Sequence, residues 1–191
     1  MSASIGQRPD SQAEMTAAAL NAARAAGQPL TAFPGPVPAT LAAAYAVQEA
    51  AITQTKDDIV GWKVAMIPPT LRERFGAERI CGPIFRGGLK KAEGDAESPF
   101  EVIPGGFAAV EAEFVLELGA DVPPDLSDPS GTDADPLVRF VRACRAGVEI
   151  AGSPISDINA LGSAAAVCDL GGNAGLLLGA ALAWPAAPEA L

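Results

Sequence analysis

The stretch that decides the fold runs from Ala108 to Leu118 and reads AAVEAEFVLEL. Its apolar residues recur with a period of two, which is the pattern of a β-strand with one apolar face. That face carries the even-numbered residues Ala108, Val110, Ala112, Phe114, Leu116 and Leu118. The other face carries the glutamates Glu111, Glu113 and Glu117. The sequence therefore predicts a half-exposed strand with its apolar face inside and its acidic face outside.

Two of these glutamates are spaced for convergence on one ion. Glu111 and Glu113 are two residues apart, so they point to the same side of the strand with Cα atoms roughly 6.6 Å apart. Neighbouring like charges repel, and a divalent cation would relieve that repulsion. The spacing alone leaves two explanations open: a pair of metal ligands, or ordinary glutamates on a solvent-facing side.

A third carboxylate interrupts the apolar segment AGVEIA of residues 146–151. A carboxylate such as Glu149 would be costly to bury there without a partner. A cation shared with Glu111 and Glu113 would be such a partner, with Glu149 as its third ligand. Three carboxylates without a thiolate pair or an imidazole suit a hard cation such as Mg²⁺ or Mn²⁺.

Lys63 lies in a second apolar, strand-like segment, within Gly61-Trp62-Lys63-Val64. It is either an exposed strand residue or a cation placed beside a site. Next to a metal-bound oxyanion, such a lysine would hold negative charge or move a proton.

The composition excludes several classes of function. The chain has 191 residues, 49% of them apolar and 19% charged, which suits a folded protein with a sizeable core. A net charge of −10 argues against nucleic-acid binding, and the lack of an uninterrupted apolar run argues against a membrane span. The absence of histidine excludes Ser-His-Asp and Cys-His nucleophiles and HExxH zinc sites.

The cysteines and the first residues bear on the compartment. Cys81, Cys144 and Cys168 are odd in number and far apart, so neither a disulfide framework nor a zinc knuckle is indicated. Residues 1–10 lack a basic start followed by an apolar segment, as a secretory signal would have. We therefore expect a cytoplasmic protein.

The rest of the chain divides into a helical start and a strand-rich remainder. Ser11 and Glu14 form a capping-box signature before an alanine-rich helix that ends at Gly27. A second helix is expected over residues 40–55, strands over 59–67, 100–103, 148–151 and 161–182, and a helix from Pro136 to just before Gly147. This organisation predicts a helical region at residues 1–56 and a mixed β domain at 57–191.

Five segments, in this order and spacing, resemble the 2-keto-4-pentenoate hydratase family of the fumarylacetoacetate hydrolase superfamily. They are Gly61-Trp62-Lys63, Gly82-Pro83-Ile84-Phe85, Val110-Glu111-Ala112-Glu113-Phe114, Ala146-Gly147-Val148-Glu149-Ile150 and the stretch from Asp169 to Gly179. The resemblance covers about residues 40 to 182. It implies an α+β fold, with N-terminal helices followed by a mixed β-roll of the fumarylacetoacetate hydrolase type.

The resemblance also implies a site. Glu111, Glu113 and Glu149 match the ligands of Mg²⁺ or Mn²⁺, Lys63 matches the active-site lysine, and Asp169 and Asn173 fall where substrate is bound. The implied reaction is hydration of a short 2-hydroxydienoic or 2-oxo acid such as 2-hydroxypenta-2,4-dienoate, in the breakdown of aromatic compounds. Its carboxylate and C2 oxygen would chelate the cation.

Several alternatives stay open at this point. A 2-oxo-acid decarboxylase or a C–C hydrolase of the same superfamily would use the same chelation, and a non-catalytic homologue would serve as a structural or interaction subunit. Members of the family continue beyond the equivalent of Gly179, so we expect an incomplete roll at the C-terminal end. Unpaired strand edges in such a roll predict self-association into a homo-oligomer.

Overall fold

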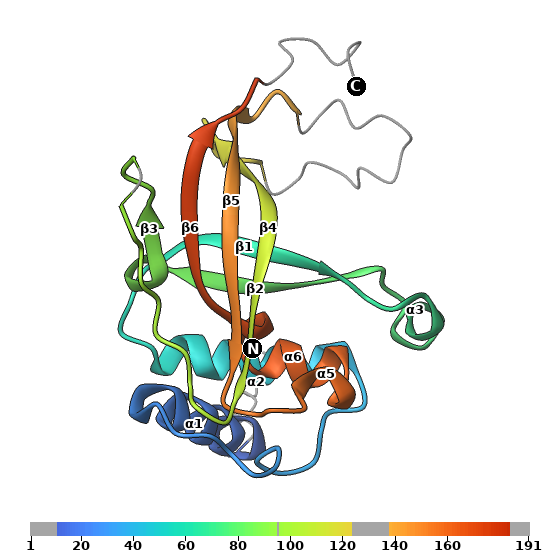
Figure 1. The fold of residues 1–191 in the computed structure, drawn as a ribbon. Coiled ribbons are helices and arrows are strands. Elements are labelled where there is room, and N and C mark those ends of the chain that lie inside the picture. The colour runs from blue at the N-terminus through green and yellow to red at the C-terminus, as the bar shows by residue number, and fades with distance from the viewer. Residues whose placement is uncertain (1–10, 95, 124–137, 184–191) are drawn as a thin grey trace, which may run out of the picture.

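The computed structural model describes residues 11–94, 96–123 and 138–183. Among these residues no helix is both long and apolar enough to cross a membrane. The chain opens with two helices, α1 (Ser11–Ala26) and α2 (Leu41–Gln54), which cross beneath the strands in Figure 1. Ser11 is the first helical residue of α1, and Thr40 caps α2 by accepting a hydrogen bond from the amide of Ala43.

The strands form two sheets. In the smaller one β1 (Ile59–Met66) pairs antiparallel with β2 (Arg79–Phe85), and α3 (Pro69–Phe75) connects them. The larger sheet has the order β3-β6-β5-β4. Its strands are β3 (Leu89–Lys91), β4 (Phe107–Leu118), β5 (Val141–Ser153) and β6 (Asn173–Ala181), and the short 3₁₀ turn Arg86–Gly88 precedes β3.

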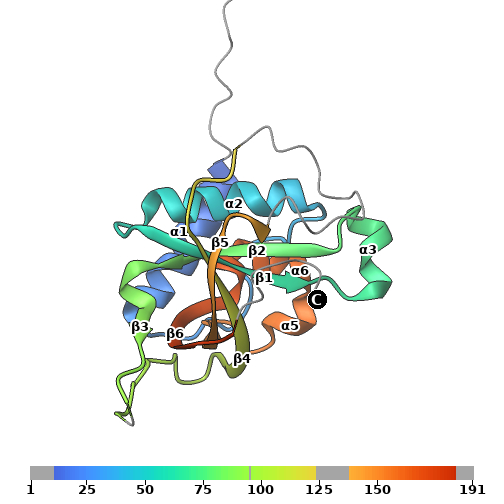
Figure 2. The same cartoon turned by 90° about the horizontal axis from the view of Figure 1, so that it is seen from above.

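The two sheets lie in separate layers. In Figure 1 the upright strands β4, β5 and β6 cross in front of the β1–β2 ribbon, and the view from above in Figure 2 separates the two. The predicted mixed α+β architecture, N-terminal helices followed by a mixed β-roll, is thus the observed one.

The main core lies at the lower end of the sheets, between the two N-terminal helices and α5 (Ile158–Leu161) and α6 (Ser163–Cys168). Leu20, Val47 and Val167 are almost fully buried in it. One buried polar side chain joins three elements there, because the Gln48 amide donates to the carbonyls of Cys81 at 3.1 Å and Val167 at 3.0 Å. These contacts hold the helical layer against β2.

The helix expected from Pro136 to just before Gly147 is wrong from Val141 onward, because residues 141–153 form the continuous strand β5. Its apolar spacing is that of a helix, and pairing with β4 from Phe107 to Leu118 overrides this local preference. The start of the expected helix and most of the acidic segment 121–135 lie outside the described residues.

Two expected strands are also corrected. Residues 161–170 are largely helical, because the small residues of α6 allow it to pack closely on α2 while β6 begins only at Asn173. Residues 100–103 form no strand. Phe100 lies instead against Gly175 of β6, where a Cβ on the glycine would be 2.7 Å from its ring.

The close approach of β2 to the 3₁₀ turn Leu170–Gly172 gives a testable prediction. A Cβ on Gly82 would lie 2.3 Å from the carbonyl oxygen of Leu170, which is backbone and cannot swing away. We expect Gly82→Ala to lower the free energy of unfolding by about 1–3 kcal/mol, measured by urea denaturation. In the matched control Gly61→Ala the nearest atom is 3.8 Å away, so a change of less than about 0.5 kcal/mol is expected. Equal losses in both variants would contradict this explanation.

Candidate metal centre

Three carboxylates meet on the side of the larger sheet that faces β1. Glu111 and Glu113 come from β4 and Glu149 from β5, and one oxygen from each lies within 4.8 Å of the others. The register explains this, because Glu111 is directly opposite Glu149 and Glu113 is opposite Gly147. Gly147 has no side chain, and the close approach requires this, because a Cβ there would lie 2.5 Å from Cγ2 of Val115. Glu149 is buried, and Glu111 and Glu113 are exposed.

Lys63 reaches this cluster from β1. Its Nζ lies 2.8 Å from Oε1 of Glu149, and both side chains are largely buried. The stem of Lys63 passes over Gly171, where an added Cβ would lie 3.3 Å from Cδ of the lysine. Gly171 has a φ of 72°, so the glycine serves both the turn and the close approach.

Asn173, the first residue of β6, orients the buried carboxylate. Its side-chain amide donates to Oε1 of Glu149 at 3.0 Å and to the carbonyl of Gly175 at 3.4 Å. Oε1 of Glu149 thus accepts from an amide and lies against an ammonium, which answers the expectation that a buried Glu149 needs partners.

The electrostatics of the cluster favour a cation. Partial burial, followed by the charges of Glu149 and Glu111, raises the pKa of Glu113, and the ammonium of Lys63 opposes the rise. Three carboxylates face one lysine, so the site keeps an excess of negative charge. The donors are carboxylate oxygens alone, the set that Mg²⁺ and Mn²⁺ prefer.

A groove of about 690 Å³ runs beside the cluster between the two sheets. Lys63, Glu113 and Glu149 line it together with Trp62, Leu176 and Leu178. The volume suits a small organic molecule, and the lining combines a charged end with apolar walls. The arrangement can therefore accept a cation at its charged end and a small, partly apolar molecule along its walls.

Asp169 lies elsewhere in the same region and is fully buried. Its Oδ1 accepts from Nε of Arg24 at 2.7 Å, and its Oδ2 has no hydrogen-bond partner among the described residues. The resemblance had suggested a role for Asp169 in substrate binding. Its observed partner is the guanidinium of α1, and substrate contact by Asp169 stays a prediction.

Arg24 is the functional candidate that sequence reasoning missed. Besides Asp169 Oδ1, its guanidinium donates to the carbonyls of Gly152 at 2.8 Å, Asp169 at 3.1 Å and Asn173 at 3.1 Å. It thereby ties α1 to the end of β5 and to the residue that orients Glu149. Its only sequence signal was a single cation in the last turn of an alanine-rich helix, which is a common place for a solvent-exposed residue.

Glu117, the third glutamate of the acidic face, takes part in a different interaction. Its carboxylate lies 2.6 Å from Nε of Arg145 and 3.0 Å from Nη2 of Arg142. These hydrogen bonds, first from Arg145 and then from Arg142, lower the pKa of Glu117. The strand thus presents two glutamates to the cluster and one to a pair of arginines on β5.

Comparison with solved structures identifies the fold. Two structures of 4-oxalocrotonate decarboxylase from Pseudomonas putida G7 match the chain at 17% identity, one complexed with calcium and acetate (TM-score 0.63) and one with magnesium and adipate (TM-score 0.62). The fold is of the fumarylacetoacetate hydrolase type. Each match covers 88% of this chain and 62% of the decarboxylase chain. No protein-family profile and no curated protein sequence matches the chain.

The Arg24–Asp169 pair gives a prediction for stability. Arg24→Met leaves a buried carboxylate without its cation, so we expect a loss of about 3–5 kcal/mol in the free energy of unfolding. The double variant Arg24→Met/Asp169→Asn removes both charges and is expected to be more stable than Arg24→Met alone. Urea denaturation of the four proteins of this cycle measures the coupling.

Arg142→Met is the matched control, since Arg142 is 68% exposed and its loss is expected to cost at most about 1 kcal/mol. Simple addition of the two single losses in the double variant would show that Arg24 and Asp169 do not depend on each other.

Proposed function

We propose that the protein is a divalent-cation-dependent lyase that hydrates a short 2-hydroxydienoic or 2-oxo acid such as 2-hydroxypenta-2,4-dienoate. The observation that carries the proposal is the convergence of Glu111, Glu113 and Glu149 within 4.8 Å, with Nζ of Lys63 against Glu149. A groove of suitable volume borders the cluster. In this proposal the substrate belongs to the breakdown of aromatic compounds, and the protein acts in the cytoplasm.

The three carboxylates would hold Mg²⁺ or Mn²⁺, with exposed Glu111 and Glu113 on one strand and buried Glu149 on the next. When bound, the cation supplies Lewis-acid chemistry, which stabilises negative charge on the C2 oxygen of a chelated 2-oxo acid. Without a bound cation, the three carboxylates leave the site with an excess of negative charge. The side-chain amide of Asn173 orients Glu149 by donating a hydrogen bond to its Oε1.

Lys63 is the proton-carrying group of the proposal. Its ammonium lies in the groove at the edge of the carboxylate cluster, where it would hold the negative charge of the substrate or move a proton to and from its carbon chain. The apolar walls at Trp62, Leu176 and Leu178 would receive the hydrocarbon part of the substrate. Asp169 and Asn173 complete the proposed substrate-binding set.

Decarboxylation of a 2-oxo acid is the second candidate. It is favoured by the likeness in fold to 4-oxalocrotonate decarboxylase, and its chemistry needs the same chelation. C–C hydrolysis and a non-catalytic role as an interaction subunit are the further alternatives. The expected assembly of the chain into a homo-oligomer is part of the same proposal.

Metal binding is the first test. We expect Mn²⁺ to stabilise the wild-type protein by about 2.7 kcal/mol at a concentration 100 times its dissociation constant, seen as a rise in Tm. Glu111→Gln and Glu149→Gln are expected to abolish this rise, because each removes a charged ligand. The control Glu49→Gln, on the exposed side of α2, keeps it. If neither ligand variant changes the response to Mn²⁺, the site assignment is wrong.

Turnover is the second test and separates the alternatives by product. Wild-type protein with Mn²⁺ is given 2-hydroxypenta-2,4-dienoate and 4-oxalocrotonate, and hydrated product and released CO₂ are measured separately. We expect Lys63→Met to lower kcat by about 10²–10⁴-fold, the usual contribution of a proton-transfer group. It should leave Mn²⁺ binding as tight as in the wild type or tighter, because the competing ammonium is gone. Wild-type protein that binds Mn²⁺ but converts neither acid would support the non-catalytic role.

A further inference from the structure

The side of the larger sheet that faces away from β1 is apolar. Its residues on β4 are exposed, whereas Ile150 and Cys144 on β5 are buried. Residues directly opposite each other on paired strands share a face. The register therefore places on this outer face the pairs Val110–Ile150, Ala112–Val148, Phe114–Ala146 and Leu116–Cys144, with Leu177 of β6 beside Val148. Phe114 is 78% exposed and Val110 is 75% exposed. The orientation expected from the sequence is thus reversed, since the glutamates face the second sheet and the apolar residues face outward.

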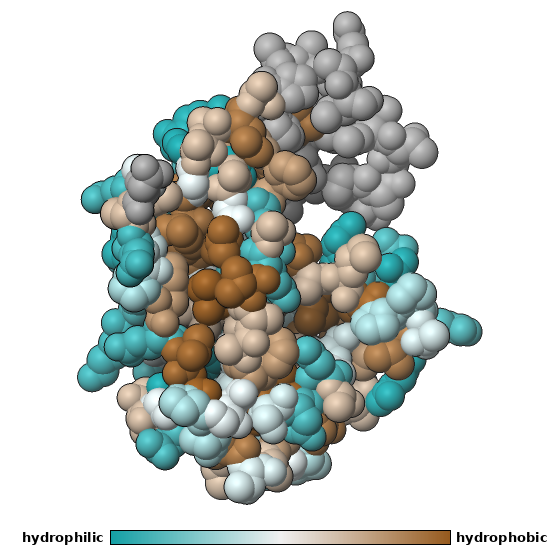
Figure 3. All heavy atoms as spheres, in the orientation of Figure 1, coloured by the Kyte–Doolittle hydropathy of each residue, from teal (hydrophilic) through white to brown (hydrophobic). Residues whose placement is uncertain are grey.

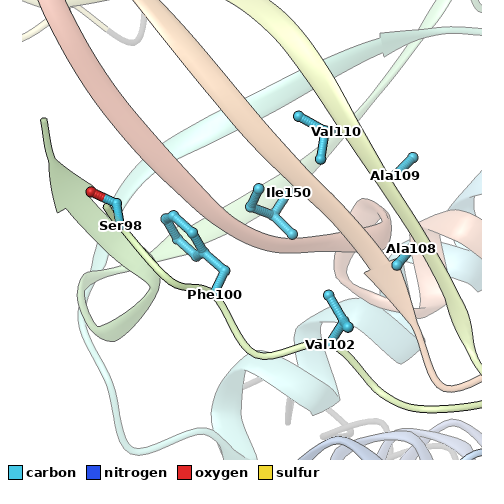
Figure 4. Close-up of a pocket in the computed structure, with 7 residues that line it drawn as sticks. All are labelled: Ser98, Phe100, Val102, Ala108, Ala109, Val110 and Ile150. Carbon is cyan, nitrogen blue, oxygen red and sulfur yellow. The ribbon is translucent and has the colours of Figure 1, made fainter. Parts of the chain in front are cut away.

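Little of the described chain covers this outer face. Figure 3 shows apolar residues gathered over the middle of the molecule in the orientation of Figure 1. Only the segment around Phe100 and Val102 borders it, and a shallow hollow of about 290 Å³ remains between that segment and Val110 and Ile150, as Figure 4 shows. The strands β4, β5 and β6 extend past the helical layer (Figure 1).

The size of the outer face exceeds what single surface residues explain. Val110, Phe114 and Leu116 lie on one side of the same strand and are 75%, 78% and 49% exposed. Contiguous apolar patches of this kind reach only ~300–600 Å² on a typical monomer and are often functional. The adjoining Leu118 and Val102 are also at least half exposed. They extend the patch toward the ~800 Å² that each partner contributes to a stable interface.

The charge pattern favours a second copy of this chain as the occupant. Over residues 110–116 of β4 and their partners on β5, the outer face carries no charged side chain. The glutamates of β4 lie on the opposite face, so two copies can meet here without bringing like charges together, although the chain carries a net charge of −10. In a two-fold contact the same patch of each copy meets its equivalent, so the patch must be complementary to itself. A sheet face with only apolar side chains meets this requirement.

We propose that two copies of the chain pack the outer faces of β4, β5 and β6 against each other as a two-layer sandwich, with sheets about 10 Å apart. Phe114 lies near the middle of the face and acts as the main anchor. The carboxylate cluster lies on the other face of each sheet. The groove beside it is also bordered by the edge strand β4 at Phe114, Leu116 and Leu118, so its end at Lys63 and Glu149 is the part that stays outside the contact. The inference rests on the proposed self-association and specifies its surface, and it is independent of the proposed metal chemistry.

The test is the molecular mass in solution. We expect light scattering coupled to size-exclusion chromatography to give twice the chain mass of 19.3 kDa for the wild-type protein at about 100 µM, with little dependence on salt. Phe114→Lys and Val110→Lys place a charge at exposed positions, so the single chain can still fold, and we expect the dissociation constant to rise at least about thirtyfold. Met15→Lys changes an exposed apolar residue of α1 and is expected to remain dimeric.

Each other result overturns the inference. A monomeric wild-type protein at 100 µM would show that the outer face is left open or is covered by a different polypeptide, and self-association itself would then fail. A wild-type dimer unaffected by Phe114→Lys and Val110→Lys would keep self-association and assign it to another surface. Aggregates of increasing size would show an open-ended contact instead of a two-fold one. The response of Tm to Mn²⁺ is measured on the same variants and tests the metal centre separately.

Discussion

The register between β4 and β5 is the constraint on which the rest of the structure depends. It places Glu111 opposite Glu149 and Phe114 opposite Ala146 along an antiparallel pair that extends from Phe107 to Leu118. Side chains on a strand alternate between faces, so a slip by one residue would move the glutamates of β4 to the outside and its apolar residues into the groove. The carboxylate cluster and the apolar outer face are therefore two results of one pairing.

Ionic contacts support this pairing at several points. Glu117 of β4 binds Arg142 and Arg145 of β5, which ties the upper ends of the two strands together. At the lower end, Arg24 of α1 binds the carbonyl of Gly152 and the carboxylate of Asp169, both close to the start of β6. The two contacts differ in energy, because the first is partly exposed to solvent and the second is buried.

Some residues of the site can be placed from the sequence pattern alone. Others reach the site only because the fold brings together segments that are distant in the chain. The period of two in residues 108–118 is enough to place Glu111 and Glu113 on one side of a strand. The apolar surroundings of Glu149 are enough to predict that it needs partners. The helix expected from Pro136 to just before Gly147 was wrong from Val141 onward, because pairing with β4 overrides the helical spacing of its apolar residues. Arg24 could not be assigned, because its partners lie more than 120 residues away in the chain.

The sequence by itself determined the alternation of β4 and the two N-terminal helices. It also supplied three glutamates suited to one hard cation and excluded histidine-dependent catalysis. These properties depend on composition and on contacts between residues close in the chain. Only the tertiary structure decided that Lys63 meets Glu149, that Arg24 binds Asp169 and that the apolar side of β4 faces outward. An alternating pattern defines two faces of a strand, but which face is covered depends on the layer that packs against it, and here that layer is β1 with its lysine.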